Sequence, residues 1–296
     1  MEINVTAKIG DRFTHGLQEV LSVIDQINQS HDDEDILVFS ENIFITPLFI
    51  LPLMVYISGC NKEIRYRYTN NYLDTICFGT GGIIPEKIGT NEFNQLLNKC
   101  SSKTYIPIIS FPTSVNYTKE RNGVISTIED ILSNQSKLQP NITRGLKYLI
   151  GEIVDNIVEH SESERGYIFT QYFPRKRYLD VCIADRGITL LGSYRKMTGN
   201  TIEDHLSAMK AANQGISTKN LPDAENRGYG ILTSKKMIIG GLSGNFIMLS
   251  GNALYLKSRE VDQSTALPDI VNWQGTIVAM RIPYVNKRFD YIDFVE

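Results

Sequence analysis

Residues 148–161 (YLIGEIVDNIVEHS) constrain the fold more than any other stretch, because they combine a polar pattern with an apolar one. Glu152, Asn156 and His160 recur every four residues, so a helix here would align them along one face. The residues that would pack beside this polar row are Leu149, Ile153, Ile157 and Val158. A carboxylate, an amide and an imidazole on a half-buried helix cost stability unless something engages them. The alternative is an ordinary amphipathic helix with a solvated polar face.

Composition excludes several classes of protein. The chain has 296 residues, enough for two domains of ordinary size. Apolar residues make up 42% and charged residues 21%, as in a typical soluble globular protein. The net charge of −3 leaves no basic excess to neutralise phosphates, so we expect no nucleic acid partner. Four scattered cysteines without a CxxC pair, and an N-terminus without a signal-peptide pattern, favour the reducing cytoplasm.

The apolar run 43–58 (IFITPLFILPLMVYIS) is the one stretch that suggests a membrane. It is shorter than the roughly 20 residues that span a bilayer. It also contains Pro47 and Pro52. We therefore predict a buried strand-to-helix element and no membrane partner.

The first part of the chain alternates between two kinds of pattern. Apolar or alternating runs at 36–40, 63–69 and 103–111 predict strands. A helix is predicted over 47–56, because proline favours the first helical turn. Strands that alternate with helical stretches predict a small α/β unit over residues 1–112.

The order of strand, proline-initiated apolar helix and strand resembles the STAS domain of anti-sigma-factor antagonists. The resemblance implies a regulatory domain. In that family a serine or threonine at the start of the helix can be phosphorylated, and Thr46 has a comparable place. An ordinary N-cap residue would explain Thr46 as well.

A second domain is predicted after the polar, turn-rich stretch 111–122. Alternating runs at 167–173 and 178–184, joined by the basic turn PRKR, predict a β-hairpin. The second run ends at a DRG sequence whose first residue is Asp185, where a flexible glycine would let a strand-end carboxylate face a pocket. A plain β-turn uses the same residues. Further strands are predicted at 245–250, 253–257 and 275–282.

Residues 188–227 are polar and loop-like, with one amphipathic helix expected at 202–213. Such a long segment before a GxG sequence has the layout of a mobile lid over a ligand. Gly228 and Gly230 would let backbone N–H groups approach phosphate oxygens, and a helix expected from about Ile231 would add the positive end of its dipole. A tight turn would also account for the two glycines.

Four motifs thus follow one another: Glu152-xxx-Asn156-xxx-His160 on a helix, Asp185-x-Gly187 at a strand end, Gly228-x-Gly230 before a helix, and Gly275-Thr276 opening a last strand. Their order resembles the GHKL ATPase superfamily, which includes histidine kinases, the gyrase B and MutL ATPase modules and anti-sigma serine kinases. The resemblance covers residues 120–285. It implies an α/β fold of the Bergerat type, a two-layer sandwich of a mixed sheet with helices on one face. Residues 286–296 would form a C-terminal tail.

The resemblance also implies ATP and Mg²⁺ as ligands. Asn156 would coordinate the metal through its amide oxygen. Glu152 would be catalytic, orienting or deprotonating the attacking group. Asp185 would accept a hydrogen bond from the adenine amino group, with Gly187 and Thr276 beside the ring. The other residues expected to contact the nucleotide are His160, Thr189, Lys219, Arg227, Gly228, Tyr229 and Gly230.

One position departs from the family, whose D-x-G-x-G motif has Thr189 here in place of the second glycine. The chain also lacks a convincing phosphoacceptor histidine upstream and a transducer domain downstream. We therefore expect a bacterial signalling regulator of the anti-sigma type, an ATPase or Ser/Thr kinase that acts on a regulatory protein and could form a homodimer. Thr189 leaves open a non-hydrolysing interaction module, in which ATP orders the lid at 188–227. A degenerate relative without nucleotide is the third alternative.

Overall fold

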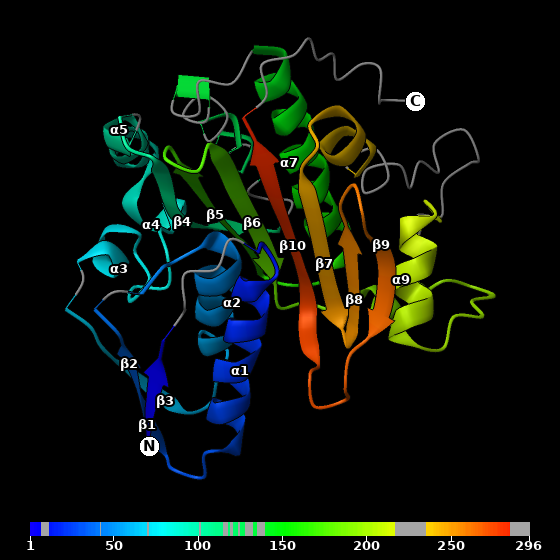
Figure 1. Cartoon of the computed structure of the whole chain (residues 1–296), viewed down its shortest axis with the longest axis horizontal. Helices are drawn as coiled ribbons and strands as arrows, with labels where there is room; N and C mark the ends of the chain where they lie inside the picture. Colours follow the sequence, from blue (N-terminus) through cyan, green and yellow to red (C-terminus); the bar gives the residue numbers. More distant parts are fainter. Residues whose placement is uncertain are drawn as a thin grey trace.

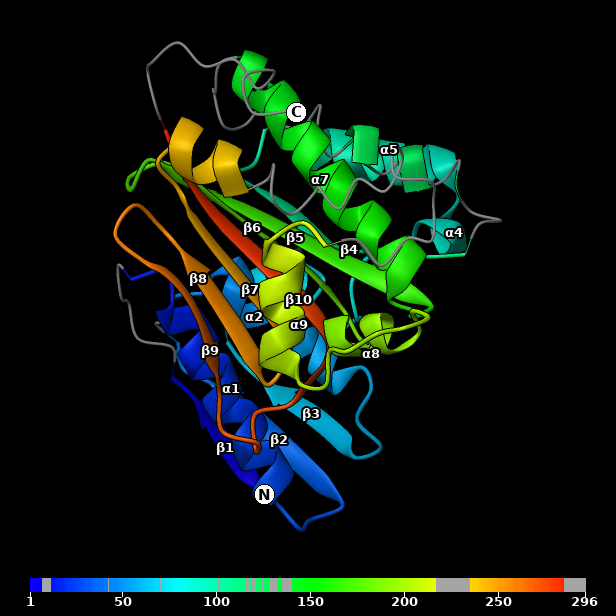
Figure 2. The same ribbon diagram turned by 90° about the vertical axis from the view of Figure 1, so that its right-hand side faces the viewer.

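The computed structural model shows a mixed α/β protein (Figure 1). It describes residues 1–6, 12–41, 43–69, 71–100, 102–114, 118, 121–123, 125–127, 133–134, 140–216 and 235–284. Two β-sheets form the framework, a smaller one of three strands and a larger one of seven. Helices lie between the two sheets and on the far side of the larger sheet (Figure 2).

The smaller sheet has three parallel strands in this order: β1 (Glu2–Val5), β2 (Glu34–Phe39) and β3 (Glu63–Arg67). Two helices connect them: α1 (His15–Gln29) and α2 (Pro47–Ile57). The predicted strands at 36–40 and 63–69 and the predicted helix at 47–56 are confirmed to within a few residues. β1 and α1 had no counterpart among the predicted elements.

The larger sheet has the spatial order β4-β5-β6-β10-β7-β8-β9. Its strands are β4 (Tyr105–Pro112), β5 (Arg165–Phe173), β6 (Tyr178–Asp185), β7 (Asn245–Gly251), β8 (Ala253–Lys257), β9 (Asp262–Ala266) and β10 (Trp273–Pro283). The predicted hairpin is confirmed as β5–β6, and three other predicted strands as β7, β8 and β10. Every neighbouring pair of these strands is antiparallel, so the expectation of a mixed sheet is wrong for them. Short turns join β5 to β6, β7 to β8 and β8 to β9, and such turns permit only antiparallel pairing.

β4 corrects the prediction for the first part of the chain. The strand predicted at 103–111 exists, but it pairs with β5 and belongs to the larger sheet. All its residues from Ile106 to Pro112 are buried, and they contribute to the cores on both faces of the larger sheet. Three short helices precede it: α3 (Tyr72–Thr75), α4 (Pro85–Ile88) and α5 (Thr90–Cys100). The division into two domains stays a prediction.

Side chains of the larger sheet alternate between two buried faces, as the period of a strand requires. On β6, Val181 and Ile183 join the core beneath α7 (Pro140–His160). Cys182 and Ala184 join the core shared with α1 and α2. Helices therefore cover both faces: α7, within residues 120–285, covers the first, and α1 and α2, within residues 1–112, cover the second (Figure 2). The second cover comes from the N-terminal part of the chain.

α2 explains the apolar run at 43–58. Every residue from Pro47 to Val55 is buried, so the helix has no polar face. It packs against α1 on one side and against β5, β6 and β10 on the other. Within the ranges described, no helix is both long enough and apolar enough to cross a bilayer.

The segment predicted as a lid begins with two packed helices. α8 (Leu190–Arg195) follows β6 and was not predicted, whereas α9 (His205–Asn213) confirms the helix expected at 202–213. Leu191 and Tyr194 pack against alanines of α9, and the Tyr194 hydroxyl donates to the carbonyl of Ile216 at 2.6 Å. α9 also contacts β7, β8 and β9. Residues 217–234, with the helix start expected near Ile231, lie outside the described residues, and a π-helix (η2, Lys236–Gly241) then leads into β7.

Candidate functional site

α7 presents the polar row at the spacing expected from the sequence. Its buried face includes Leu149, Ile153 and Ile157, while Glu152, Asn156 and His160 are half-buried beside that face. At about 1.5 Å of rise per residue, the row extends over about 12 Å of helix. The three side chains thus lie at the margin between core and solvent, where a ligand could reach them.

The turn after β6 contacts the C-terminal end of α7. The N–H group of Ile188 donates to the carbonyl oxygen of Ser161 at 2.6 Å, and the Ser193 hydroxyl donates to the carbonyl of His160 at 3.0 Å. A Cβ atom on Gly187 would lie 1.9 Å from the same Ser161 oxygen, so only glycine fits. The DRG turn therefore lies directly against the end of the helix that carries the polar row.

Asp185 is buried at the centre of this contact, with an exposed fraction of 1%. Its Oδ1 accepts a hydrogen bond from the Gly187 N–H at 2.8 Å. Gly275, at a φ of +97°, packs so closely that a Cβ there would lie 2.7 Å from Oδ1. Burial raises the pKa of Asp185 to about 7, although the N–H groups of Gly187 and Thr276 donate to it and lower the pKa. A buried carboxyl that titrates near neutrality is a frequent property of functional sites.

Two hydroxyl groups join the segments around Asp185. The Oγ atoms of Ser250 and Thr276 are 3.3 Å apart. Ser250 also donates to the carbonyl of Gly275 at 2.9 Å and accepts from the Leu190 N–H at 3.0 Å. Ser250 thus links β7, β10 and the start of α8. It was not among the predicted residues, and its one sequence signal is a buried polar residue at the end of an apolar strand.

Thr189 caps α8, because its Oγ1 accepts a hydrogen bond from the Gly192 N–H at 3.2 Å. A glycine at this position, as in the family motif, would provide no side-chain acceptor. The departure from the family motif therefore has a defined structural role: it fixes the start of the segment predicted as a lid.

The structure brings together Asp185, Gly187, Thr189 and Thr276, and places them beside the His160 end of α7. Asn156 and Glu152 lie one and two turns further back along the helix, respectively. Five predicted residues lie outside the described residues: Lys219, Arg227, Gly228, Tyr229 and Gly230.

No group of three or more His, Cys, Asp or Glu side chains that could hold a metal occurs within the described residues. A magnesium site with one amide ligand would not require such a group, because phosphates and water complete it.

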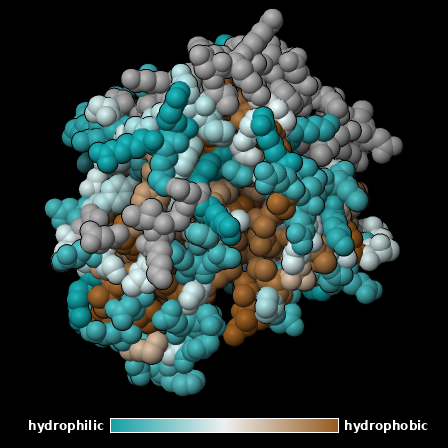
Figure 3. Space-filling view, in the orientation of Figure 1, coloured by the Kyte–Doolittle hydropathy of each residue, from teal (hydrophilic) through white to brown (hydrophobic). Residues whose placement is uncertain are grey.

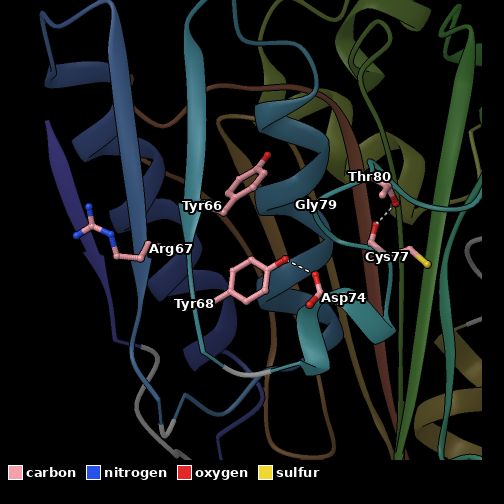
Figure 4. Close-up of a pocket in the computed structure, with 7 residues that line it drawn as sticks. All are labelled: Tyr66, Arg67, Tyr68, Asp74, Cys77, Gly79 and Thr80. Atoms are coloured by element: carbon pink, nitrogen blue, oxygen red, sulfur yellow. Dashed lines mark hydrogen bonds between the residues drawn. The ribbon is translucent and has the colours of Figure 1, made fainter.

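Two cavities are lined by other residues. A broad one of about 580 Å³ opens between β3 and the segment around α3 (Figure 4). The rings of Tyr66 and Tyr68 point into it, and the Tyr68 hydroxyl donates to Asp74. A second cavity, of about 250 Å³, lies beside the candidate site and is lined by Arg186 and Trp273 among others.

Thr46 occupies the N-cap position of α2, but its side chain makes no capping hydrogen bond. Its hydroxyl oxygen instead lies against α1, only 2.9 Å from where a Cβ on Gly16 would be. In this side-chain conformation a phosphate on the half-buried Thr46 would meet α1.

Comparison of the sequence with known proteins identifies no relative. No model of a known protein family matches the chain, and no curated protein is significantly similar to it. Any function therefore has to be argued from the residues and their geometry.

Proposed function

We propose that the protein is a Mg-ATP-binding regulator of the GHKL superfamily, acting as an ATPase or as a Ser/Thr protein kinase of the anti-sigma type. One observation carries the proposal. Three segments far apart in the sequence meet at Asp185: the end of α7, the turn into α8, and the start of β10. These segments hold three of the four sequence motifs. The fourth motif lies outside the described residues.

The chemistry of the Asp185 carboxyl group suits an adenine base. In its charged form the carboxylate is an acceptor only, so it would favour the adenine amino group over the carbonyl that guanine has in its place. Close packing of Gly187 and Gly275 fixes its position. The hydroxyl of Thr276 could hold the ring directly or through a water molecule.

Asn156 and Glu152 would serve the phosphate side of the site. Asn156 would hold Mg²⁺, which when bound supplies positive charge to the phosphates. Glu152, one turn earlier on α7, would orient or deprotonate the attacking hydroxyl or water. Phosphoryl transfer depends chiefly on positioning and charge stabilisation, so a small set of residues can suffice.

Thr189 supports a second candidate function, a nucleotide-gated interaction module without turnover. The capped α8 and the packed α8–α9 pair form an ordered surface at the start of the proposed lid. ATP that favours one arrangement of the lid could change what this surface binds, without hydrolysis. A regulatory protein, or a second copy of the chain, would then be the partner.

Calorimetric titration with ATP and its β,γ-imido analogue, with and without Mg²⁺, tests the proposal. We expect magnesium-dependent binding of both nucleotides and no binding of GTP. Asn156→Ala should abolish the magnesium dependence, and Asp185→Asn should weaken binding about tenfold or more, the effect of one lost hydrogen bond of about 1.4 kcal/mol.

Asp155→Ala is the matched control, because Asp155 is an exposed neighbour of Asn156 outside the polar row. It should bind nucleotide like the wild type. Absence of binding by the wild type at millimolar nucleotide would refute the proposal. Phosphate release by wild type and Glu152→Gln then separates an enzyme from a module that only binds.

A further inference from the structure

The cavity of about 250 Å³ lies between α1, the end of α2 and residues 270–274. Its lining combines three kinds of chemistry. Leu21, Ile24 and Val271 supply apolar surface, and Asp25 and Arg186 supply opposite charges. Trp273 forms part of the wall towards Asp185.

Asp25 has an unmet hydrogen-bonding capacity. Its Oδ1 is shielded from solvent and has no hydrogen-bond partner in the part of the chain that the structure describes. Its other oxygen accepts from the Gln29 side chain at 2.8 Å. A buried acceptor without a donor costs about 1–3 kcal/mol, and more for a charged group. Rotation of the Asp25 carboxyl group towards an ammonium group bound in the cavity would give this oxygen a donor and remove that cost.

Arg186 supplies the positive charge. One of its N–H groups donates to the carbonyl of Tyr56 at 2.6 Å, and the guanidinium lies 6.0 Å from the centroid of the Tyr56 ring. A guanidinium has five N–H donors, so this bond leaves others for a carboxylate. Because Asp25 Oδ1 has no partner and the other oxygen binds Gln29, the two charges do not neutralise each other by direct contact.

Apolar surface is also exposed at the same place. Ile270 lines the cavity, yet its exposed fraction is 66%. In the view of Figure 3, apolar side chains gather near the centre of the visible surface. A ligand with an apolar group would remove such surface from water, at about 25 cal/mol per Å².

We propose that this cavity binds a small zwitterion with an aliphatic side chain, such as an aliphatic amino acid. The ammonium group contacts Asp25, the carboxylate contacts Arg186, and the side chain packs between Leu21, Ile24 and Ile270. The cavity places a negative charge, a positive charge and apolar surface side by side. A zwitterion with an aliphatic side chain has one group to match each of them.

The cavity is connected to the candidate nucleotide site through two of its walls. Arg186 directly follows Asp185, and the Trp273 indole N–H donates to the Asp185 carbonyl at 3.3 Å. A ligand that holds Arg186 and Trp273 would therefore stabilise one position of the Asp185 turn. This second step, in which the amino acid changes ATP affinity, rests on the proposed function.

Trp273 is the one tryptophan of the chain, so its fluorescence reports on the cavity without a label. The titration uses L-leucine, isopentylamine (the same chain with only the positive charge), 4-methylpentanoate (only the negative charge) and glycine, all without nucleotide. We expect a saturable fluorescence change with leucine. The affinity for each of the other three compounds should be lower by a factor of about ten or more, as the loss of one contact of about 1.4 kcal/mol predicts.

Asp25→Asn should lower the affinity for leucine about tenfold and leave the affinity for 4-methylpentanoate unchanged. Glu19→Gln, the same change on an α1 residue that does not line the cavity, should bind leucine like the wild type. Gly59→Ala keeps both charges but should also weaken binding, because its Cβ would lie 1.9 Å from Nη1 of Arg186. Circular dichroism checks that each variant is folded.

Three results would overturn the inference: no saturable response to leucine at millimolar concentration by fluorescence and calorimetry, equal affinity for 4-methylpentanoate, or an unchanged affinity in Asp25→Asn. Leucine binding by a protein that fails to bind ATP would support the cavity and refute only the proposed function. An ATP affinity that leucine does not change would refute the regulatory step.

Discussion

Replacing Asp185 with asparagine should make the protein less sensitive to pH. Asparagine keeps the shape of the side chain and an oxygen to accept from the Gly187 N–H, but it cannot be charged. Burial raises the pKa of Asp185 from 3.8 to about 7. Between these values the folded protein holds a proton that the unfolded chain releases, so the free energy of unfolding falls as pH rises. Above about pH 7 both states are ionised, and this contribution becomes constant.

The size of the effect follows from the same two pKa values. Each pH unit between them is worth about 1.36 kcal/mol, so the complete cost of ionising Asp185 in the fold is about 4 kcal/mol. Between about pH 5 and pH 8, the wild type should lose roughly 2–3 kcal/mol relative to Asp185→Asn. Asp180, whose pKa burial raises to about 6, contributes equally to both proteins and cancels.

Urea unfolding of both proteins across this pH range measures the difference. Asp262→Asn is the control, because the side chain of Lys257 lowers the pKa of Asp262 below 3.8. Its contribution is present above the unfolded pKa and is lost only in stronger acid, so the difference from wild type should be constant from about pH 5 to pH 8. Parallel stability profiles for wild type and Asp185→Asn would show that the Asp185 carboxyl is not raised in the fold, and the reasoning would fail.

Three further predictions concern contacts at the site and within the larger sheet, and each is tested by urea unfolding. Gly187→Ala should lower stability by about 1–3 kcal/mol through overpacking against Ser161, whereas Gly151→Ala, with open space in α7, should raise it by about 0.5–1 kcal/mol. Equal effects would contradict the packing described. Arg281→Met leaves Asp180 buried without the cation that donates to it at 2.7 Å, and should cost about 3–5 kcal/mol. The loss should be smallest at and below about pH 6, where Asp180 is protonated in both folded proteins, and should grow as pH rises above it; a loss independent of pH would contradict this. Thr189→Ala should cost about 1 kcal/mol and Thr189→Gly a few tenths, and equal stability of all three proteins would exclude the α8 cap.

Patterns with a strong period were enough to predict much of the larger sheet. The runs that became β6 and β10 are apolar on both faces, and the basic turn between β5 and β6 identified the hairpin. β9 has no such signal, because its sequence DQSTA is polar and four of its five residues are exposed. β4 belongs to the larger sheet because it pairs with β5, about 60 residues later in the chain. A local sequence pattern cannot predict such a distant partner.

α1 shows a different limit of prediction from sequence. Its buried residues include Leu17, Val20, Ile24 and Ile27, which do follow a helical period. Gly16 and several β-branched residues lower its intrinsic helix propensity. The glycine is explained by tertiary structure, since a side chain there would meet Thr46 of α2.

The candidate site was predictable where a motif marks the backbone. Asp185, Gly187 and Thr276 do lie together. Asp185 ends β6, Gly187 belongs to the turn that follows, and Thr276 lies on β10, which pairs with β6. Ser250 and Ser161 were missed, since single serines carry no pattern. Their importance arises from contacts that exist only when β7, β10 and α7 are assembled.

The order of strands in the larger sheet also determines when the protein can fold during synthesis. β10 lies between β6 and β7 at the centre of the sheet, yet it is made after all the other strands in the described part of the chain. Until Pro283 has left the ribosome, β6 and β7 have no common neighbour, and the apolar surface of α2 lacks part of its cover. A growing chain therefore keeps part of this wholly apolar helix without its native cover until the last strand is made, and transiently exposed apolar surface of this kind favours aggregation.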